Sequence, residues 1–294
     1  KVFIQDIQYS GKSIEEKIKQ IQLILKSNKI SYYILASLDS IAWLLNIRGS
    51  DVDYTPLSFA YAIISCNKKV DLFINNKKIK NIRNTLNPFV NFHSIEKVRN
   101  FIAMLSSGSI IGIDKTKTPF IFDKICKEND LSVKYFSDPC NYPKAQKNNI
   151  ELAGARKANI RDGVSITKFL YWLKNEMIIS ETNEMNASKY LLDIRKNNEL
   201  FYSLSFETIS AIGEHAALPH YRVTNESNLP FKINTIYLVD SGAQYFDGTT
   251  DITRTVIIGK PTKEQKDRFT RVLKGHISIA TASFNANVKG SKLD

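Results

Sequence analysis

Two aspartates eleven residues apart stand beside two strand-like runs of the sequence. The apolar run Ile236–Val239 leads into Asp240, and a second run extends from Asp251 to Ile258. Between them, Asp247-Gly248 is a residue pair that tight turns prefer. The second run is therefore expected to return antiparallel to the first and to bring Asp240 and Asp251 near one another.

Two carboxylates that converge beside buried strands repel each other and lose hydration. Such a pair is stable when one carboxyl group is protonated or when a cation neutralises both. Carboxylate oxygens suit divalent ions such as Mn, Mg or Ca, and two bridging carboxylates suggest a paired-metal site with ions about 3.5–4 Å apart. A plainer interpretation makes Asp240 a strand-end turn residue and Asp251 a cap. Spacing alone favours the plainer interpretation.

A second cluster, Ser210–Tyr221, contains two histidines among small residues. Pro219 fixes the backbone before His220, which would allow that imidazole to be aimed into a cleft. The five-residue offset between His215 and His220 does not match a helical zinc-ligand pair, and no cysteine lies nearby. Surface or hydrogen-bonded histidines remain the alternative.

Several other chemistries lack their motifs. The sequence has no GxGxxG, GxxxxGK[ST] or GxSxG pattern, which argues against nucleotide-dependent and serine-hydrolase functions. The three cysteines, Cys66, Cys126 and Cys140, form neither an even disulfide framework nor a CxxC pair. They indicate reduced thiols in a cytoplasmic protein.

The formal net charge is +12, yet the lysines are spread through Asn- and Ile-rich sequence without a basic stripe interleaved with aromatic residues. This pattern is typical of a solvated surface, so no nucleic-acid partner is expected. No segment approaches the ~20 consecutive apolar residues of a membrane helix, and the first residues lack a secretory signal. A globular protein without a membrane partner is expected.

The elements that must position these residues follow from periodicity. Apolar residues at helical spacing predict a helix over 13–28, and residues 37–39 offer N-cap chemistry for a second helix. Residues 120–128 predict a third. Strand-like runs lie between and after these helices, at 32–36, 59–65, 70–74 and 110–113. Alternating helices and strands predict a layered α/β domain.

The pattern breaks at Asp138–Pro143, which contains two prolines, so a domain boundary is expected near 140–150. Beyond it, 150–175 and 183–197 are long helical patterns. From Phe206 onward, short strands and turns predict an α+β arrangement.

Three separated segments, Asp39–Asp51, Ser205–Tyr221 and Leu238–Thr255, resemble the Xaa-Pro aminopeptidases of the three-domain type (aminopeptidase P) in their order along the chain. These enzymes belong to the creatinase and methionine aminopeptidase, or pita-bread, superfamily. The resemblance implies a creatinase N-terminal-like middle domain at 1–145 with a ribonuclease H-like layered sheet. It also implies an incomplete α+β pita-bread catalytic domain at 146–294.

The resemblance also implies residue roles. Asp240 would bind one metal ion, Asp251 would bridge two, and His220 would face the substrate and help to stabilise the tetrahedral intermediate. The expected cofactor is two divalent ions, with manganese first and zinc, cobalt or magnesium as alternatives. Glu214 and His215 depart from the family's pattern before the active-site histidine, which leaves the local substrate contacts open.

The implied reaction is hydrolysis of the bond before a proline at the second position of a peptide, and the implied assembly is a homodimer. A non-catalytic pita-bread binding module and a prolidase- or creatinase-like hydrolase are the alternatives. The family's remaining metal ligands, a histidine and two glutamates, would follow residue 294, and a first domain would precede residue 1. The chain alone is therefore expected to be inactive and to bind little metal.

Overall fold

The computed structural model describes all residues, Lys1–Asp294. Its contacts divide the chain into two compact units that interleave along the sequence. Unit 1 comprises residues 1–164, 195–207 and 242–251, and unit 2 comprises residues 165–194, 208–241 and 252–294.

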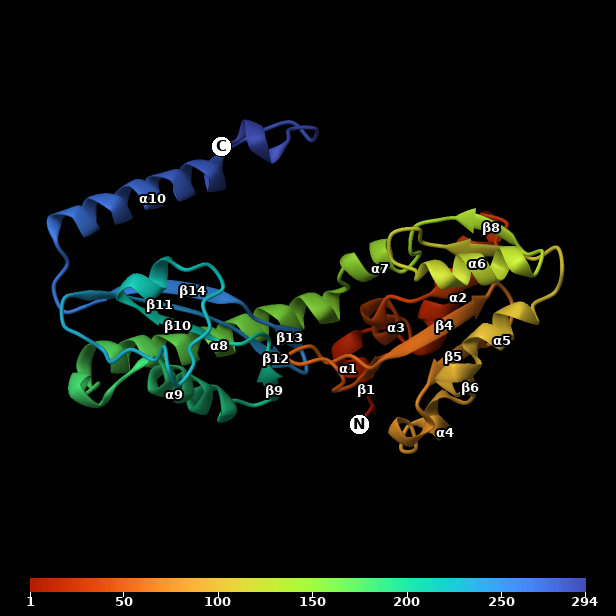
Figure 1. Cartoon of the computed structure of the whole chain (residues 1–294), viewed down its shortest axis with the longest axis horizontal. Helices are drawn as coiled ribbons and strands as arrows, with labels where there is room; N and C mark the ends of the chain where they lie inside the picture. Colours follow the sequence, from red (N-terminus) through yellow and green to blue (C-terminus); the bar gives the residue numbers. More distant parts are fainter. The chain divides into compact units, whose positions relative to one another are not determined.

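A six-stranded mixed sheet forms the centre of unit 1 (Figure 1). Its strands lie in the order β6-β5-β4-β2-β7-β8, with β2 antiparallel to β4 and parallel to β7. Their bounds are β2 Tyr32–Leu35, β4 Ala60–Ser65, β5 Val70–Ile74, β6 Val90–His93, β7 Ile110–Ile113 and β8 Ser132–Tyr135.

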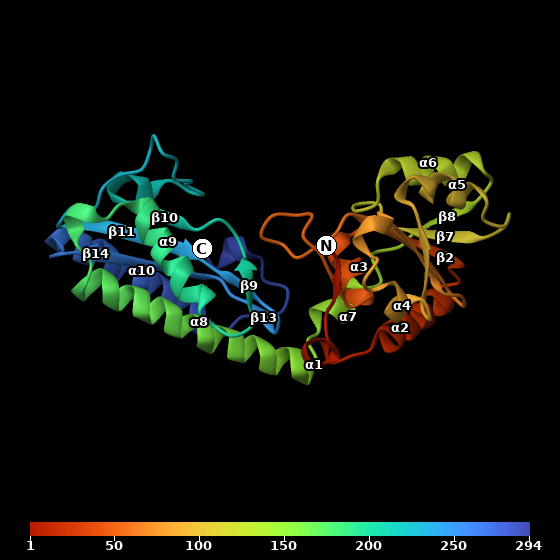
Figure 2. The ribbon, with the colours of Figure 1, turned by 90° about the horizontal axis from the view of Figure 1, so that it is seen from below.

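Helices cover both faces of this sheet, and alternate strand residues point to each face. Tyr33 and Leu35 of β2 pack toward α2, α3 and α4, whereas Ile34 packs toward α5 and α6 (Figure 2). The helix bounds are α2 Ile14–Ser27, α3 Leu38–Leu44, α4 Arg83–Leu86, α5 Val98–Ala103 and α6 Phe120–Glu128. The expected layered α/β domain is confirmed.

The two edge strands of the sheet, β6 and β8, were not expected from the sequence. β8 is largely exposed and reads Ser-Val-Lys-Tyr, so it lacks an apolar run. Each edge strand is held by parallel pairing with its inner neighbour, β5 or β7. Edge strands need only one partner and one partly buried face, which leaves a weak sequence signal.

Unit 1 also contains a three-stranded sheet in the order β13-β12-β9. Its strands are β9 Phe201–Leu204, β12 Ala243–Tyr245 and β13 Gly248–Thr249, and Tyr245 pairs with Gly248 across the expected Asp247-Gly248 turn. The sequence did not indicate that this turn joins a hairpin of its own. The smaller elements are β1 Phe3–Ile4, β3 Ile47–Arg48, α1 Ile7–Ser10 and α7 Asn141–Ala145.

Two long helices follow the expected helical patterns: α8 Asn149–Asn175 and α9 Glu184–Lys196. Within unit 1, the first half of α8 lies against the β12–β13 turn. A side chain at Gly154 would come within 2.3 Å of the Asp247 carbonyl oxygen, and one at Gly248 would meet Ala155 and Ala158. Small residues on α8 therefore let the hairpin backbone approach the helix closely.

Unit 2 is built on an antiparallel sheet in the order β10-β11-β14, with bounds β10 Ile209–Ile212, β11 Thr235–Ser241 and β14 Ile252–Ile258. Its core joins Phe169 and Leu173 of α8 and Leu191 of α9 to Tyr237 and Val239 of β11. The last long helix, α10 Lys263–Thr281, starts at a capping box formed by Thr262 and Gln265. None of the helices has the length and hydropathy that a membrane crossing requires.

Candidate active site

Asp240 lies near the end of β11, in unit 2. Its register partner on the antiparallel strand β14 is Thr253, whose hydroxyl donates a hydrogen bond of 2.8 Å to Asp240 Oδ1. The side chain is partly exposed, and its second oxygen accepts no hydrogen bond. Asp240 therefore offers a carboxylate oxygen without a hydrogen bond near the end of β11.

Asp251 is the residue immediately before β14 and the last residue of the unit 1 segment 242–251. Strand β14 runs against β11 with Ser241 opposite Ile252, so the expected antiparallel return is confirmed. The Asp251 carboxylate is exposed and receives no hydrogen bond.

His220 lies in the loop after the short 3₁₀ helix Gly213–Ala217, in unit 2. Its backbone has φ +57°, an uncommon conformation for a residue with a side chain. The side chain is exposed, and no hydrogen bond or ion pair joins it to Asp240. Strained backbone of this kind persists where the surrounding structure fixes it.

The fixing group is Glu184, the first residue of α9, which the sequence did not single out. Its buried carboxylate accepts hydrogen bonds from Ile212 N (2.8 Å) and Leu229 N (3.1 Å) and from the Tyr221 hydroxyl (2.9 Å). His215 Nδ1 lies 2.9 Å from the same carboxylate. Glu184 thus ties down both ends of the loop that carries the active-site candidate.

His215 has a structural role in this network. Its ring stacks on Tyr221 with centroids 4.3 Å apart, and its Nδ1 contacts Glu184. Burial, together with the Glu184 carboxylate, raises the pKa of Tyr221, so the phenol stays a hydrogen-bond donor. At His215, where the sequence departs from the family pattern, the structure therefore places a partly buried imidazole that is hydrogen-bonded to Glu184.

The donor set for a metal is partial. The chain holds no cluster of three or more His, Cys, Asp and Glu side chains that could bind an ion. Asp240 and Asp251 nevertheless retain carboxylate oxygens without protein hydrogen bonds, which is the chemistry that hard divalent cations require. Their residue types fit two ligands of a larger set.

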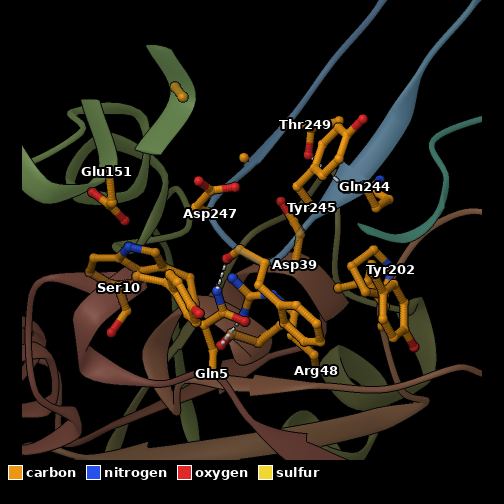
Figure 3. A pocket seen from close by; sticks show the side chains of 18 of the residues that line it. Gln5, Ser10, Asp39, Arg48, Glu151, Tyr202, Gln244, Tyr245, Asp247 and Thr249 are labelled. Carbon is orange, nitrogen blue, oxygen red and sulfur yellow. Dashed lines mark hydrogen bonds between the residues drawn. The ribbon is translucent and has the colours of Figure 1, made fainter. Parts of the chain in front are cut away.

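Unit 1 also contains a cavity of about 540 Å³, separate from these residues (Figure 3). Gln5, Asp39 and Arg48 line it together with Tyr202 and Asp247. None of His220, Asp240 and Asp251 contributes to its walls. The cavity is therefore not the predicted site.

Two family models match the chain. The creatinase/prolidase N-terminal domain matches residues 1–151, and metallopeptidase family M24 matches residues 153–294. Together they confirm the two kinds of domain expected from the sequence.

Curated relatives match over the whole chain. A protein named "Probable Xaa-Pro aminopeptidase P" from Coccidioides posadasii is 38% identical over 304 residues, covering 100% of this chain and 50% of the relative. One of the same name from Ajellomyces capsulatus is 38% identical over 309 residues, covering 100% and 48%. The chain spans about half the length of these relatives.

Solved structures agree in fold. The X-prolyl aminopeptidase from Caenorhabditis elegans, described as a cytosolic enzyme with a di-nuclear active site, matches with a TM-score of 0.89 at 33% identity, covering 100% of this chain and 49% of that one. The prolidase from Pyrococcus horikoshii matches with a TM-score of 0.69 at 20% identity, covering 95% and 75%. The chain belongs to the family in which a creatinase/prolidase N-terminal domain precedes a metallopeptidase domain of family M24.

Proposed function

We propose that the full-length gene product containing these residues is a metal-dependent Xaa-Pro aminopeptidase. It would release the first residue of peptides that have proline at the second position. The observation that carries the proposal is the match over the entire chain to relatives of that name, combined with carboxylates at Asp240 and Asp251 that each retain at least one oxygen without a protein hydrogen bond.

Asp240 and Asp251 would hold two divalent ions, and manganese is the ion that we propose. When bound, the ions would supply Lewis acidity and an activated water nucleophile. Asp240 lies on β11, the central strand of its three-stranded sheet, while Asp251 lies in the segment that leads into β14. A carboxylate on a strand is held more closely than one on a loop, which favours a fixed metal geometry.

His220 would face the substrate carbonyl. A neutral or protonated imidazole can donate a hydrogen bond to the oxygen that gains negative charge during attack. The Glu184 network fixes the loop on either side of His220, so the His220 backbone would be held in place before substrate arrives. This preorganisation is what such stabilisation requires.

The proposal is tested with the purified full-length protein and three substrates: an Xaa-Pro-Xaa tripeptide, an Xaa-Pro dipeptide and a tripeptide with alanine in place of proline. We expect cleavage of the first, loss of activity with a chelator and recovery with Mn²⁺. Asp240→Asn and Asp251→Asn should each lower kcat/KM at least about 10³-fold. Preference for the dipeptide would indicate a prolidase, and a folded protein that cleaves none of them would indicate a binding module.

Residues 1–294 alone should bind Mn²⁺ weakly and show no hydrolysis, because two carboxylates make a poor site and affinity grows with ligand number. Isothermal titration calorimetry with Mn²⁺, run separately on this chain and on the full-length protein, measures the difference in affinity.

We further propose a cytoplasmic location, a homodimeric assembly and a domain boundary near residue 145. The first is supported by the cytosolic enzyme from Caenorhabditis elegans.

A further inference from the structure

Thr250, the residue before Asp251, has a partner at every polar atom. Its N–H donates to Ala243 O (2.9 Å), and its carbonyl accepts from Ser205 Oγ (2.9 Å). Its Oγ1 accepts from Ala243 N (3.0 Å) and donates to Asp162 Oδ2 (2.9 Å). The peptide unit that leads into the Asp251 backbone is thereby fixed from both sides.

Asp162, on α8, is the centre of this network. Asp162 is 2% exposed and its partner Arg195 is fully buried. Arg195 donates to the two Asp162 oxygens from Nε (2.8 Å) and Nη2 (2.9 Å), and the Tyr245 hydroxyl donates to Oδ1 (2.9 Å). With Thr250, the carboxylate accepts four hydrogen bonds and has no freedom to rotate.

The backbone around Thr250 has little room to move. A Cβ at Gly242 would lie 2.0 Å from the Thr250 carbonyl oxygen, so only glycine fits at this position. At the other end of the hairpin, Arg161 donates to both oxygens of Asp247, each at 3.0 Å. Helix α8 therefore clamps the segment 242–250 at its turn and at its end.

We infer that the buried Asp162–Arg195 pair is a positioning device for the metal ligand Asp251, acting through the Thr250 hydroxyl. The inference rests on the proposed metallopeptidase function. Partners that orient a metal ligand without touching the ion commonly change metal affinity or activity by about 10–100-fold when removed. The Asp162 network would serve Asp251 in this way, and neither Asp162 nor Arg195 would touch substrate.

The decisive variants are made in the full-length protein. Thr250→Val keeps the shape of the side chain but removes the hydroxyl, and we expect Mn²⁺ affinity to fall about 10–100-fold, with kcat reduced and KM nearly unchanged. Thr250→Ser keeps the hydroxyl and should restore both within about threefold. Tyr245→Phe removes one donor to Asp162 and should weaken Mn²⁺ binding in the same direction by less. Titration calorimetry with Mn²⁺ and steady-state kinetics measure these changes.

Thr249→Val is the matched control. Thr249 is the neighbouring exposed residue of the same hairpin, and its hydroxyl donates only to Gln244 Oε1 (2.6 Å). It should leave Mn²⁺ affinity within about twofold of the wild type.

Wild-type Mn²⁺ affinity in a folded Thr250→Val protein would overturn the inference. If that variant does not fold, unchanged affinity in Tyr245→Phe would overturn it equally. A wild-type protein that binds Mn²⁺ and cleaves peptides while both variants match it would remove only the positioning role. A wild-type protein that binds no Mn²⁺ and cleaves nothing would remove the proposed function as well.

Discussion

Asp162 and Glu184 are both buried carboxylates that hold a segment beside a predicted active-site residue, yet they are neutralised differently. Asp162 faces the guanidinium of Arg195, a full counter-charge. Glu184 faces two backbone amides, a phenol and the imidazole of His215. The unit 1 network therefore depends on one ion pair, whereas the unit 2 network depends on hydrogen bonds spread over a loop. Under the proposed function, the first would suit the metal ligand Asp251 and the second would suit the loop that carries His220.

The largest effect is expected from Asp162→Ala. Removing the carboxylate leaves the Arg195 charge buried without a partner, and one guanidinium nitrogen, Nη1, already has none. Loss of one member of a buried ion pair costs about 3–5 kcal/mol. Urea unfolding of the full-length protein measures this loss. Glu15→Ala, which breaks an exposed ion pair with Lys19, should lower the unfolding free energy by at most about 1 kcal/mol. Equal losses of stability in the two variants would show that the buried Asp162–Arg195 pair contributes no more than an exposed one.

Glu184→Gln tests the other network. An amide NH₂ would replace one oxygen that now accepts from Leu229 N and the Tyr221 hydroxyl, so donors would face donors. Leaving buried donors unpaired costs about 1–3 kcal/mol.

The functional signature of Glu184→Gln should differ from that of Thr250→Val. The loop that carries His220 would loosen, so kcat should fall about tenfold while Mn²⁺ affinity stays within about twofold of the wild type. Calorimetry and kinetics on one preparation make the comparison. A weakened Mn²⁺ affinity in Glu184→Gln would show that the two networks are not separate in function.

Gly242→Ala probes the backbone in place of the side chains. The added methyl group would meet the Thr250 carbonyl oxygen, and such overpacking costs about 1–3 kcal/mol. Gly163→Ala, at a helical position of α8 where a Cβ meets no atom within 4 Å, should instead stabilise by about 0.5–1 kcal/mol. Thermal unfolding should show a lower stability for Gly242→Ala and a higher stability for Gly163→Ala. An unchanged stability in Gly242→Ala would mean that the backbone of this segment can shift to accommodate the methyl group.

Much of the fold followed from periodicity, because long helices and buried strands repeat their apolar residues over many positions. Helices α2, α6, α8 and α9 lie where their patterns predicted. The edge strands β6 and β8 and the inner hairpin β12–β13 did not, because they are short and are held by partners distant in sequence. The roles of Asp240, Asp251 and His220 came from family resemblance, since their spacing alone favoured ordinary turn and cap residues.

The two supporting carboxylates have a signal in the sequence. Asp162 lies four residues from Ala158 and from Ile166, on the apolar stripe of α8. Arg195 continues the stripe of α9 that contains Glu184 and Leu191. A charged residue on an apolar stripe indicates a buried side chain that has a polar or oppositely charged partner. The identity of the partner could not be predicted, because it depends on how distant segments meet.

A buried lysine extends the comparison to a cation whose hydrogen-bond acceptors are all neutral. Lys17 is 1% exposed, and its Nζ donates to Trp43 O (3.0 Å) and Asn46 Oδ1 (2.6 Å), both neutral acceptors. Burial lowers the pKa of Lys17 from 10.5 to about 8, with Arg48 and Lys12 adding to the decrease and Glu151 and Cys140 opposing it.

The sign of the pH effect follows from the protons bound in each state. Below pH 8 the amine is charged in both states, and the folded state bears the full cost of burying it. Between pH 8 and 10.5 the unfolded chain holds the proton that the folded chain has lost, so this group makes stability rise with pH, by at most about 1.4 kcal/mol per pH unit.

Lys17→Met should lack that rise in stability. Denaturant unfolding at pH 7.5, 8.5 and 9.5 measures the wild-type minus variant difference, which should grow with pH, whereas Lys19→Met, an exposed position on the same helix, should give a constant difference. Parallel curves for Lys17→Met and the wild type would mean that the neutral acceptors at Trp43 and Asn46 keep the buried Lys17 ammonium group protonated over this pH range.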